Sequence, residues 1–172
     1  MKFFISTFTI FLFFINPANS EQKVAFIDMD RVIFTSKPGS SIVKQLNDIN
    51  NKNLISLKKI EDKLKEKEKI IKSQKNIISD TDFQNKLNEL KSEITNYKQT
   101  RKNIIEDFDK LKIDSTNKLL KFINPIIVNF SNNMKISIIL QKKNIVMGNN
   151  DFDITDEIVK IVNADIQEFT IK

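Results

Sequence analysis

The feature that most constrains this chain is a long, lysine-rich stretch, residues 40–133, in which apolar residues repeat at steps of three and four. This spacing puts the apolar side chains on one narrow stripe of an α-helix, which is the heptad pattern of helices that pack along a seam. Two successive series carry the pattern: Leu46, Ile49, Asn53, Leu57, Ile60, Leu64, Lys67, Ile71, Gln74 and Ile78, then Phe83, Leu87, Leu90, Ile94, Tyr97, Arg101, Ile104, Phe108 and Leu111. The stretch therefore predicts two long helices packed together.

A cluster of small polar residues, 79–82, separates the two series. Such side chains compete with helical hydrogen bonds and can cap a new helix, so we expect an antiparallel hairpin with its tip near 79–82. Each arm would be roughly 55 Å long at the usual rise of a helix. Only 2 Gly and 3 Pro in 172 residues also favour long helices. Polar residues interrupt the seam at Asn53, Lys67, Gln74 and Arg101, so we expect arms that bend and fray toward the tip.

Both ends of the chain predict a small base for the hairpin. Residues 23–27, 136–140 and 144–147 are apolar runs of strand length, and a closing helix is expected with Thr155 as its cap and Ile158, Ile161 and Val162 facing a core. The predicted fold class is α+β, with a hairpin arm (40–133) projecting from a β-sheet body (21–39 and 134–172). We place the start of the first arm at Ser40 or Ser41 and expect Pro125 to kink or break the second.

Residues 1–20 are predicted to be a secretory signal peptide. Lys2 precedes an apolar run, and small residues favour cleavage after Ser20. A short membrane anchor that is left uncleaved is the alternative interpretation. No Cys follows the cleavage site, which excludes a lipoprotein, and the absence of both His and Cys from the chain lowers the expectation of catalysis.

The body is small for a self-sufficient core, and its strands are apolar on both faces. We therefore expect neighbouring copies to complete the core in a homo-oligomer. The residues predicted to form this interface are Val24, Phe26, Ile138, Leu140 and Val146.

A strand ending in Asp28-Met29-Asp30 is similar to the nucleophile motif of haloacid-dehalogenase-type phosphatases, in which two Asp residues lie near Mg²⁺. Arg31 stands where that motif has Gly, and a helical hairpin follows instead of alternating strands and helices. We predict no catalytic residue, metal or cofactor, and interpret Asp28 and Asp30 as capping or solvated acids.

The first arm also carries a predicted basic face, with Lys58, Lys63, Lys65, Lys69 and Lys72 as its members. A solvated surface supported by pairs such as Glu61 with Lys65 would account for it. Alternatively, the lysines attract acidic unfolded chains or anionic lipid. Nucleic acid is not expected as a partner because no aromatic residues are interleaved with the lysines.

The order of these segments resembles the Skp/OmpH family of periplasmic chaperones. The similarity lies in residues 24–33 and 36–39 at the front, and in 138–140, 144–146 and 153–158 at the back. The resemblance implies a periplasmic trimer whose three arms enclose unfolded outer-membrane proteins and prevent their aggregation without ATP. It also implies lipopolysaccharide as a further partner. An envelope coiled-coil adaptor that docks one folded partner is the main alternative.

Overall fold

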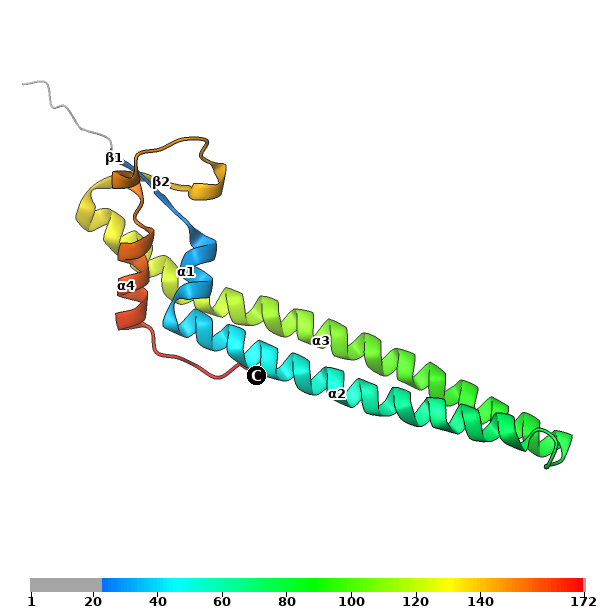
Figure 1. Ribbon diagram of the computed structural model, residues 1–172. Helices are drawn as coiled ribbons and strands as arrows, with labels where there is room; N and C mark the ends of the chain where they lie inside the picture. Colours follow the sequence, from blue (N-terminus) through cyan, green and yellow to red (C-terminus); the bar gives the residue numbers. More distant parts are fainter. Residues whose placement is uncertain (1–22, 172) are drawn as a thin grey trace, which may run out of the picture.

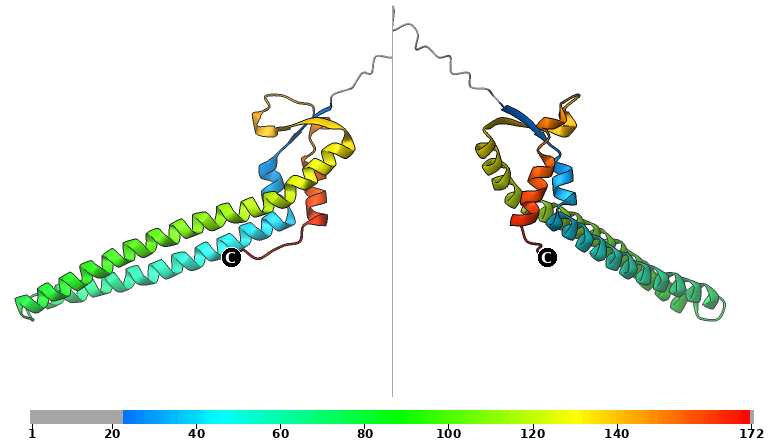
Figure 2. Two further views of the ribbon diagram at one scale, coloured as in Figure 1. Left: turned by 180° about the vertical axis from the view of Figure 1, so that it is seen from behind. Right: turned by 60° about the vertical axis from the view of Figure 1, so that its left-hand side comes forward.

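The computed structural model describes residues 23–171, which form a compact base and one long arm (Figures 1 and 2). The predicted signal peptide lies outside the described residues. In chain order the elements are β1 (Lys23–Ile27), α1 (Met29–Thr35), α2 (Lys37–Gln74), α3 (Asp80–Met134), β2 (Ile136–Gln141), the 3-10 turns η2 (Lys142–Asn144) and η3 (Asn150–Phe152), and α4 (Thr155–Asp165). The predicted α+β hairpin fold is confirmed.

Helices α2 and α3 pack antiparallel along the predicted seam. Nine of the ten positions in the first series lie in α2 and the tenth, Ile78, lies in the turn, and all ten are buried or half-buried; of the second series, in α3, only Arg101 is exposed. The turn between the helices covers residues 75–79, and the Ser79 hydroxyl caps α3 by accepting a hydrogen bond from the Asp82 amide at 3.1 Å. The heptad spacing therefore located the packed stripe of both helices.

Two of the four polar residues of the seam, Lys67 and Gln74, have partners on the opposite helix. Lys67 Nζ lies 2.9 Å from Glu89 Oε1 and 2.7 Å from Glu93 Oε1, and Lys86 Nζ donates to Gln74 Oε1 at 2.7 Å. Hydrogen-bonded partners offset much of the cost of removing polar groups from water. These interruptions of the apolar seam thus become links between the two arms.

The first arm begins earlier than Ser40 or Ser41, so that prediction is wrong. Ser36 is the N-cap of α2, and Pro38 occupies the first turn, where the missing amide is tolerated. A short helix, α1, precedes it and was not predicted; its N-cap is Asp28, whose carboxylate accepts from the Arg31 amide at 2.9 Å. Gly39 lets α1 and α2 approach closely, because a Cβ there would stand 1.5 Å from the Ile33 carbonyl oxygen.

Pro125 does not break the second arm. Helix α3 runs without interruption from Asp80 to Met134, and Figure 1 shows it changing direction where it leaves the arm and enters the base. Lys135 follows as the C-cap of α3 and adopts a left-handed conformation with φ 55°. The chain then turns back into β2.

The sheet has two strands, β1 and β2, which are parallel. The predicted third strand at 144–147 is wrong: η2 and an irregular loop occupy this region, and Val146 projects fully into solvent. The other side of β1 is occupied by the segment before α4, since the Ile154 amide donates to the Phe26 carbonyl at 3.0 Å. Among residues 23–171, no segment pairs with the other edge of β2.

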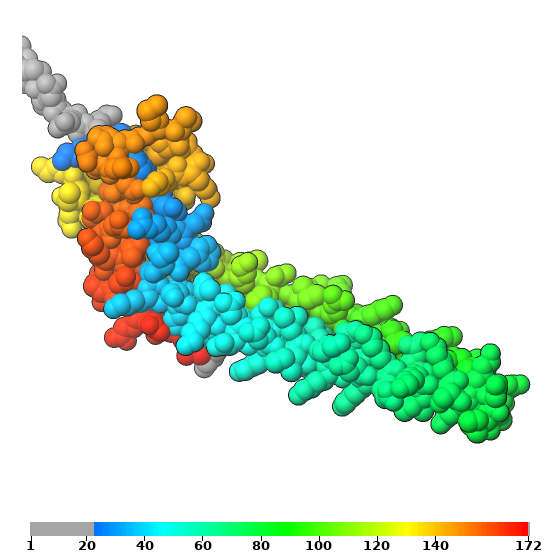
Figure 3. Space-filling view, in the orientation of Figure 1, coloured from blue at the N-terminus to red at the C-terminus, as the bar shows by residue number. Residues whose placement is uncertain are grey.

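The core lies where α1, α3, α4 and the start of α2 meet. Val32, Leu119, Ile123, Ile158 and Val162 have no exposed surface. Figure 3 shows the broad base that contains them and the narrow arm that projects from it. Burying side chains of this size stabilises the fold by about 2 kcal/mol each. The base is thus the stable root of the arm.

The start of α4 differs by one position from the prediction. Its N-cap is Ile154, and Thr155 is instead the first helical residue. The Thr155 hydroxyl accepts from the Asp28 amide at 2.9 Å, and the Asp153 carboxylate accepts from the Thr155 amide at 3.0 Å. These bonds join the end of β1 to the start of α4.

The C-terminal segment after α4 runs back to the root of the arm (Figures 1 and 2). The Gln45 side chain holds it at two points: its Nε2 donates to the Phe169 carbonyl at 3.0 Å, and its Oε1 accepts from the Ile171 amide at 3.1 Å.

None of the helices within residues 23–171 combines the length and apolar character needed to cross a membrane.

Candidate functional surfaces

One face of the two-stranded sheet carries four of the five residues predicted to form an oligomer interface. Val24 pairs with Ile138 and Phe26 with Leu140 in the parallel register, so their side chains point to the same side. Val24, Ile138 and Leu140 are 42%, 48% and 45% exposed. Ala25 and Ile27 point to the opposite side, into the core. The sheet is therefore apolar on both faces, and its outer face is only partly covered.

The loop after η2 shields part of this outer face. Phe26 is buried, and Gly148 of the loop lies so close to it that a Cβ added at Gly148 would stand 2.9 Å from the Phe26 ring. Lys142 Nζ lies 5.8 Å from the centre of the same ring. A hollow of about 510 Å³ lies between the sheet and this loop. Val146, the fifth predicted interface residue, projects from the loop into solvent together with Met147.

The unpaired edge of β2 adds directional hydrogen-bonding capacity to this apolar face. A strand edge presents free amides and carbonyls that another chain can pair with. Apolar residues beside such an edge are typical of a surface that is covered in an assembly. We call this surface the outer sheet face; its residues are Val24, Phe26, Ile138 and Leu140.

The predicted basic face of the arm divides into two groups. At 100° per residue, Lys58, Lys65, Lys69 and Lys72 share one side of α2, while Lys63 points to another side. All five side chains are exposed.

Carboxylates one turn away neutralise three of the four lysines on this shared side. Lys58 pairs with Asp62 at 2.9 Å, Lys65 with Glu61 at 2.6 Å and Lys72 with Glu68 at 2.6 Å. The hydrogen bond and charge of Asp62 raise the pKa of Lys58, and those of Lys65 lower the pKa of Glu61. Lys63 and Lys69 form no ion pair with any residue in 23–171, so the free positive charge of the arm is spread around α2.

The two acids of the phosphatase-like motif lie at the start of α1. Asp28 caps this helix through its carboxylate, and Arg31 forms an ion pair with Asp156 of α4. Asp30 is exposed in the first turn, where a negative charge favours the helix dipole. No three His, Cys, Asp or Glu side chains gather as a metal site within the described part of the chain. The geometry thus gives Asp28 a structural role.

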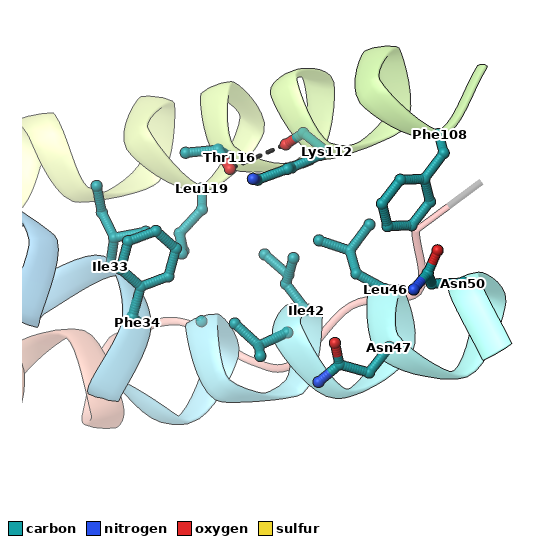
Figure 4. A pocket seen from close by; sticks show the side chains of 12 residues that line it. Ile33, Phe34, Ile42, Leu46, Asn47, Asn50, Phe108, Lys112, Thr116 and Leu119 are labelled. Atoms are coloured by element: carbon teal, nitrogen blue, oxygen red, sulfur yellow. Dashed lines mark hydrogen bonds between the residues drawn. The ribbon is translucent and has the colours of Figure 1, made fainter. Parts of the chain in front are cut away.

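A second apolar hollow, which was not predicted from the sequence, lies at the root of the arm (Figure 4). It has a volume of about 260 Å³, and α1, α2 and α3 all contribute to it. We call it the root groove; its lining residues are Ile33, Phe34, Gly39, Ile42, Val43, Leu46, Asn47, Asn50, Phe108, Lys112, Thr116 and Leu119. The only signal in the sequence was that Phe34 and Val43 are apolar without belonging to the predicted seam.

Comparison with known proteins decides the family. A model of the family described as outer membrane protein (OmpH-like) matches residues 23–162. The chain belongs to the OmpH-like family. A crystal structure of a proposed outer membrane chaperone (OmpH-like) from Caulobacter crescentus has the same fold, with a TM-score of 0.82, 17% sequence identity, and coverage of 88% of this chain and 89% of that one. No curated protein matches this OmpH-like chain.

Proposed function

We propose that this OmpH-like protein is a periplasmic holdase, a chaperone that binds unfolded outer-membrane proteins and prevents their aggregation without ATP. Family membership supports the general role of an outer-membrane chaperone. The observation that carries the specific proposal is a long, exposed hairpin arm rooted in a base with an incompletely covered apolar sheet face.

The outer sheet face is the proposed contact between copies, and we take the assembly to be a homotrimer, as in the family that the chain resembles. Contact between copies would cover Val24, Ile138 and Leu140 and could satisfy the free edge of β2. It would also give the loop around Val146 an apolar surface to pack on. The arms of the three copies would then project from one body.

The arms are the proposed client-binding elements. Apolar side chains outside the seam are half or more exposed along them, which offers many weak contacts instead of one deep pocket. These residues are Leu54, Ile55, Ile77 and Ile113. The unpaired Lys63 and Lys69 would attract acidic segments of a client, and in the same way an anionic lipid or lipopolysaccharide surface. The proposed activity is not enzymatic, which agrees with the capping role of Asp28.

An aggregation assay tests this proposal. Chain 21–172 is mixed, without nucleotide, with an unfolded outer-membrane barrel protein diluted from denaturant, and light scattering is followed over time. We expect scattering to be suppressed at a stoichiometric ratio of chaperone to client. Undiminished aggregation of the client, together with saturable binding of one folded envelope protein, would instead support the adaptor function.

A further inference from the structure

The root groove differs from the other exposed apolar surfaces in being enclosed by three helices. Ile33, Ile42 and Leu119 form its buried floor, and the half-exposed Phe34 forms one lip. Figure 4 shows the Phe108 ring at the opposite end, so that apolar side chains bound the hollow at both ends. An occupant must therefore present a large apolar group to it.

Lys112 is the only charged residue that lines the root groove. Its amine forms no ion pair with any residue from 23 to 171, although seven other lysines or arginines in this range do. Figure 4 shows the Lys112 side chain extending along the groove, with its amine directed toward the Leu119 end. An unpaired cation beside an apolar floor favours an occupant that carries a negative charge next to its apolar group.

Two asparagines complete the polar rim on the α2 side. Asn47 and Asn50 lie three residues apart on one side of the helix, and their side chains make no hydrogen bond within the described chain. Each amide has two N–H donors available. Thr116, in contrast, already donates its hydroxyl proton to the Lys112 carbonyl at 2.9 Å. The free groups of the rim are thus one ammonium and two amides.

We propose that the root groove binds the C-terminal residue of an unfolded polypeptide, with its large apolar side chain on the floor and its free α-carboxylate at Lys112. This inference rests on the proposed chaperone function and names the part of the client that this site recognises. Charge complementarity with the unpaired Lys112 selects the carboxylate, which is an acceptor-only group.

The size of the groove favours one side chain over a lipid acyl chain. Its volume of about 260 Å³ exceeds the ~150 Å³ of an apolar cavity that holds benzene and falls below the roughly 300 Å³ at which pockets for drug-sized ligands begin. One aromatic or large aliphatic side chain with its terminal backbone fits this range.

Fluorescence anisotropy with two dye-labelled peptides tests the proposal. Both peptides have one sequence ending in Phe, one with a free C-terminal carboxylate and the other with an amide. They are titrated with chain 21–172 and with the variants Lys112→Gln, Asn50→Asp and Lys110→Gln. Lys110, two residues before Lys112 on α3, is exposed and does not line the groove, so its variant is the matched control. Circular dichroism verifies that each variant is folded.

We expect the carboxylate peptide to bind about fivefold more tightly than the amide, which corresponds to one charge-assisted contact at a partly exposed site. Lys112→Gln and Asn50→Asp should abolish this preference, while Lys110→Gln should keep it. Equal binding of the two peptides, or equal effects of Lys112→Gln and Lys110→Gln, would overturn the proposal. Displacement of the peptide by dodecanoate at lower concentration than by an unlabelled carboxylate peptide would also overturn it, in favour of an acyl occupant.

A parallel aggregation assay separates this inference from the proposed function. A chain that suppresses client aggregation but shows no carboxylate preference keeps the function and loses the C-terminal site. A chain that fails to suppress aggregation at all contradicts the function itself.

Discussion

Lys67 of α2 and Glu93 of α3 join the two arms across their seam, with 2.7 Å between Nζ and Oε1. Glu89, one turn away on α3, lies 2.9 Å from the same amine. The seam pairs these residues at a position where a tight coiled coil would place two aliphatic side chains. The link therefore selects one register for the hairpin, because a shift by one residue would separate the charges.

The first prediction concerns stability at alkaline pH. Hydrogen bonds to Glu93 and Glu89 raise the pKa of Lys67, so the protonated amine stabilises the folded arm. This contribution is present in full below the unfolded pKa of about 10.4 and is lost as the pH rises through the higher folded pKa. The free energy of unfolding of the wild type should therefore fall toward that of Lys67→Met as the pH rises from about 9 to above 11. Urea titrations at several pH values measure the difference; a difference independent of pH would contradict the role of Lys67.

The second prediction concerns Gly39. Because an added Cβ would stand 1.5 Å from the Ile33 carbonyl oxygen, a backbone atom, Gly39→Ala must push α1 away from α2. We expect a loss of about 3 kcal/mol in the free energy of unfolding, at the upper end of the range for overpacking. Ser40→Ala, at the next and exposed position, is the control and should change stability by less than about 0.5 kcal/mol. Equal stability of the two variants in chemical denaturation would show that the helices are not in contact here.

The third prediction concerns acid stability at the start of α4. Burial alone would raise the pKa of Asp153, but hydrogen bonds from Lys142 and Thr155 outweigh it and lower that pKa. The stabilisation is present above the unfolded pKa of about 3.9 and is lost as the pH falls through the folded value. Asp153→Asn should cost about 1 kcal/mol at neutral pH and remove this part of the acid dependence. Denaturation at pH 7 and at about pH 2.5 measures both effects. The same loss at both values would mean that the carboxylate charge is not involved.

The fourth prediction concerns assembly through the outer sheet face. Leu140→Asp puts a charge on this face and should keep the chain monomeric if the proposed assembly forms here, because a buried unpaired charge is strongly unfavourable. Leu54→Asp changes an equally apolar, exposed residue on the arm and should leave the mass unchanged. Size-exclusion chromatography with light scattering compares them. An oligomer that survives Leu140→Asp would place the contact elsewhere.

The seam could be predicted from the sequence because helix packing depends on a local period. The positions at Leu57, Ile71 and Leu90 follow from spacing alone and are buried in the structure. From the sequence, Lys67 was predicted to interrupt the seam, because the carboxylates that bind its amine lie more than twenty residues away on α3.

The base was predicted less well because its geometry depends on contacts between distant segments. Residues 144–147 have the composition of a strand, yet they pair with no strand among residues 23–171 and form the end of η2 and a loop. The predicted start of the first arm at Ser40 or Ser41 left Gly39 outside the helix, although Gly39 belongs to the first turn of α2. The root groove could not be predicted, since Phe34, Asn50 and Lys112 come together only when three helices meet.

The mass of chain 21–172, measured by light scattering alone and again with an unfolded outer-membrane barrel protein, tests the central claim most directly. We predict a homotrimer that gains the mass of one client and keeps that client in solution without nucleotide. A chain that stays monomeric under both conditions, while the client precipitates, would contradict it.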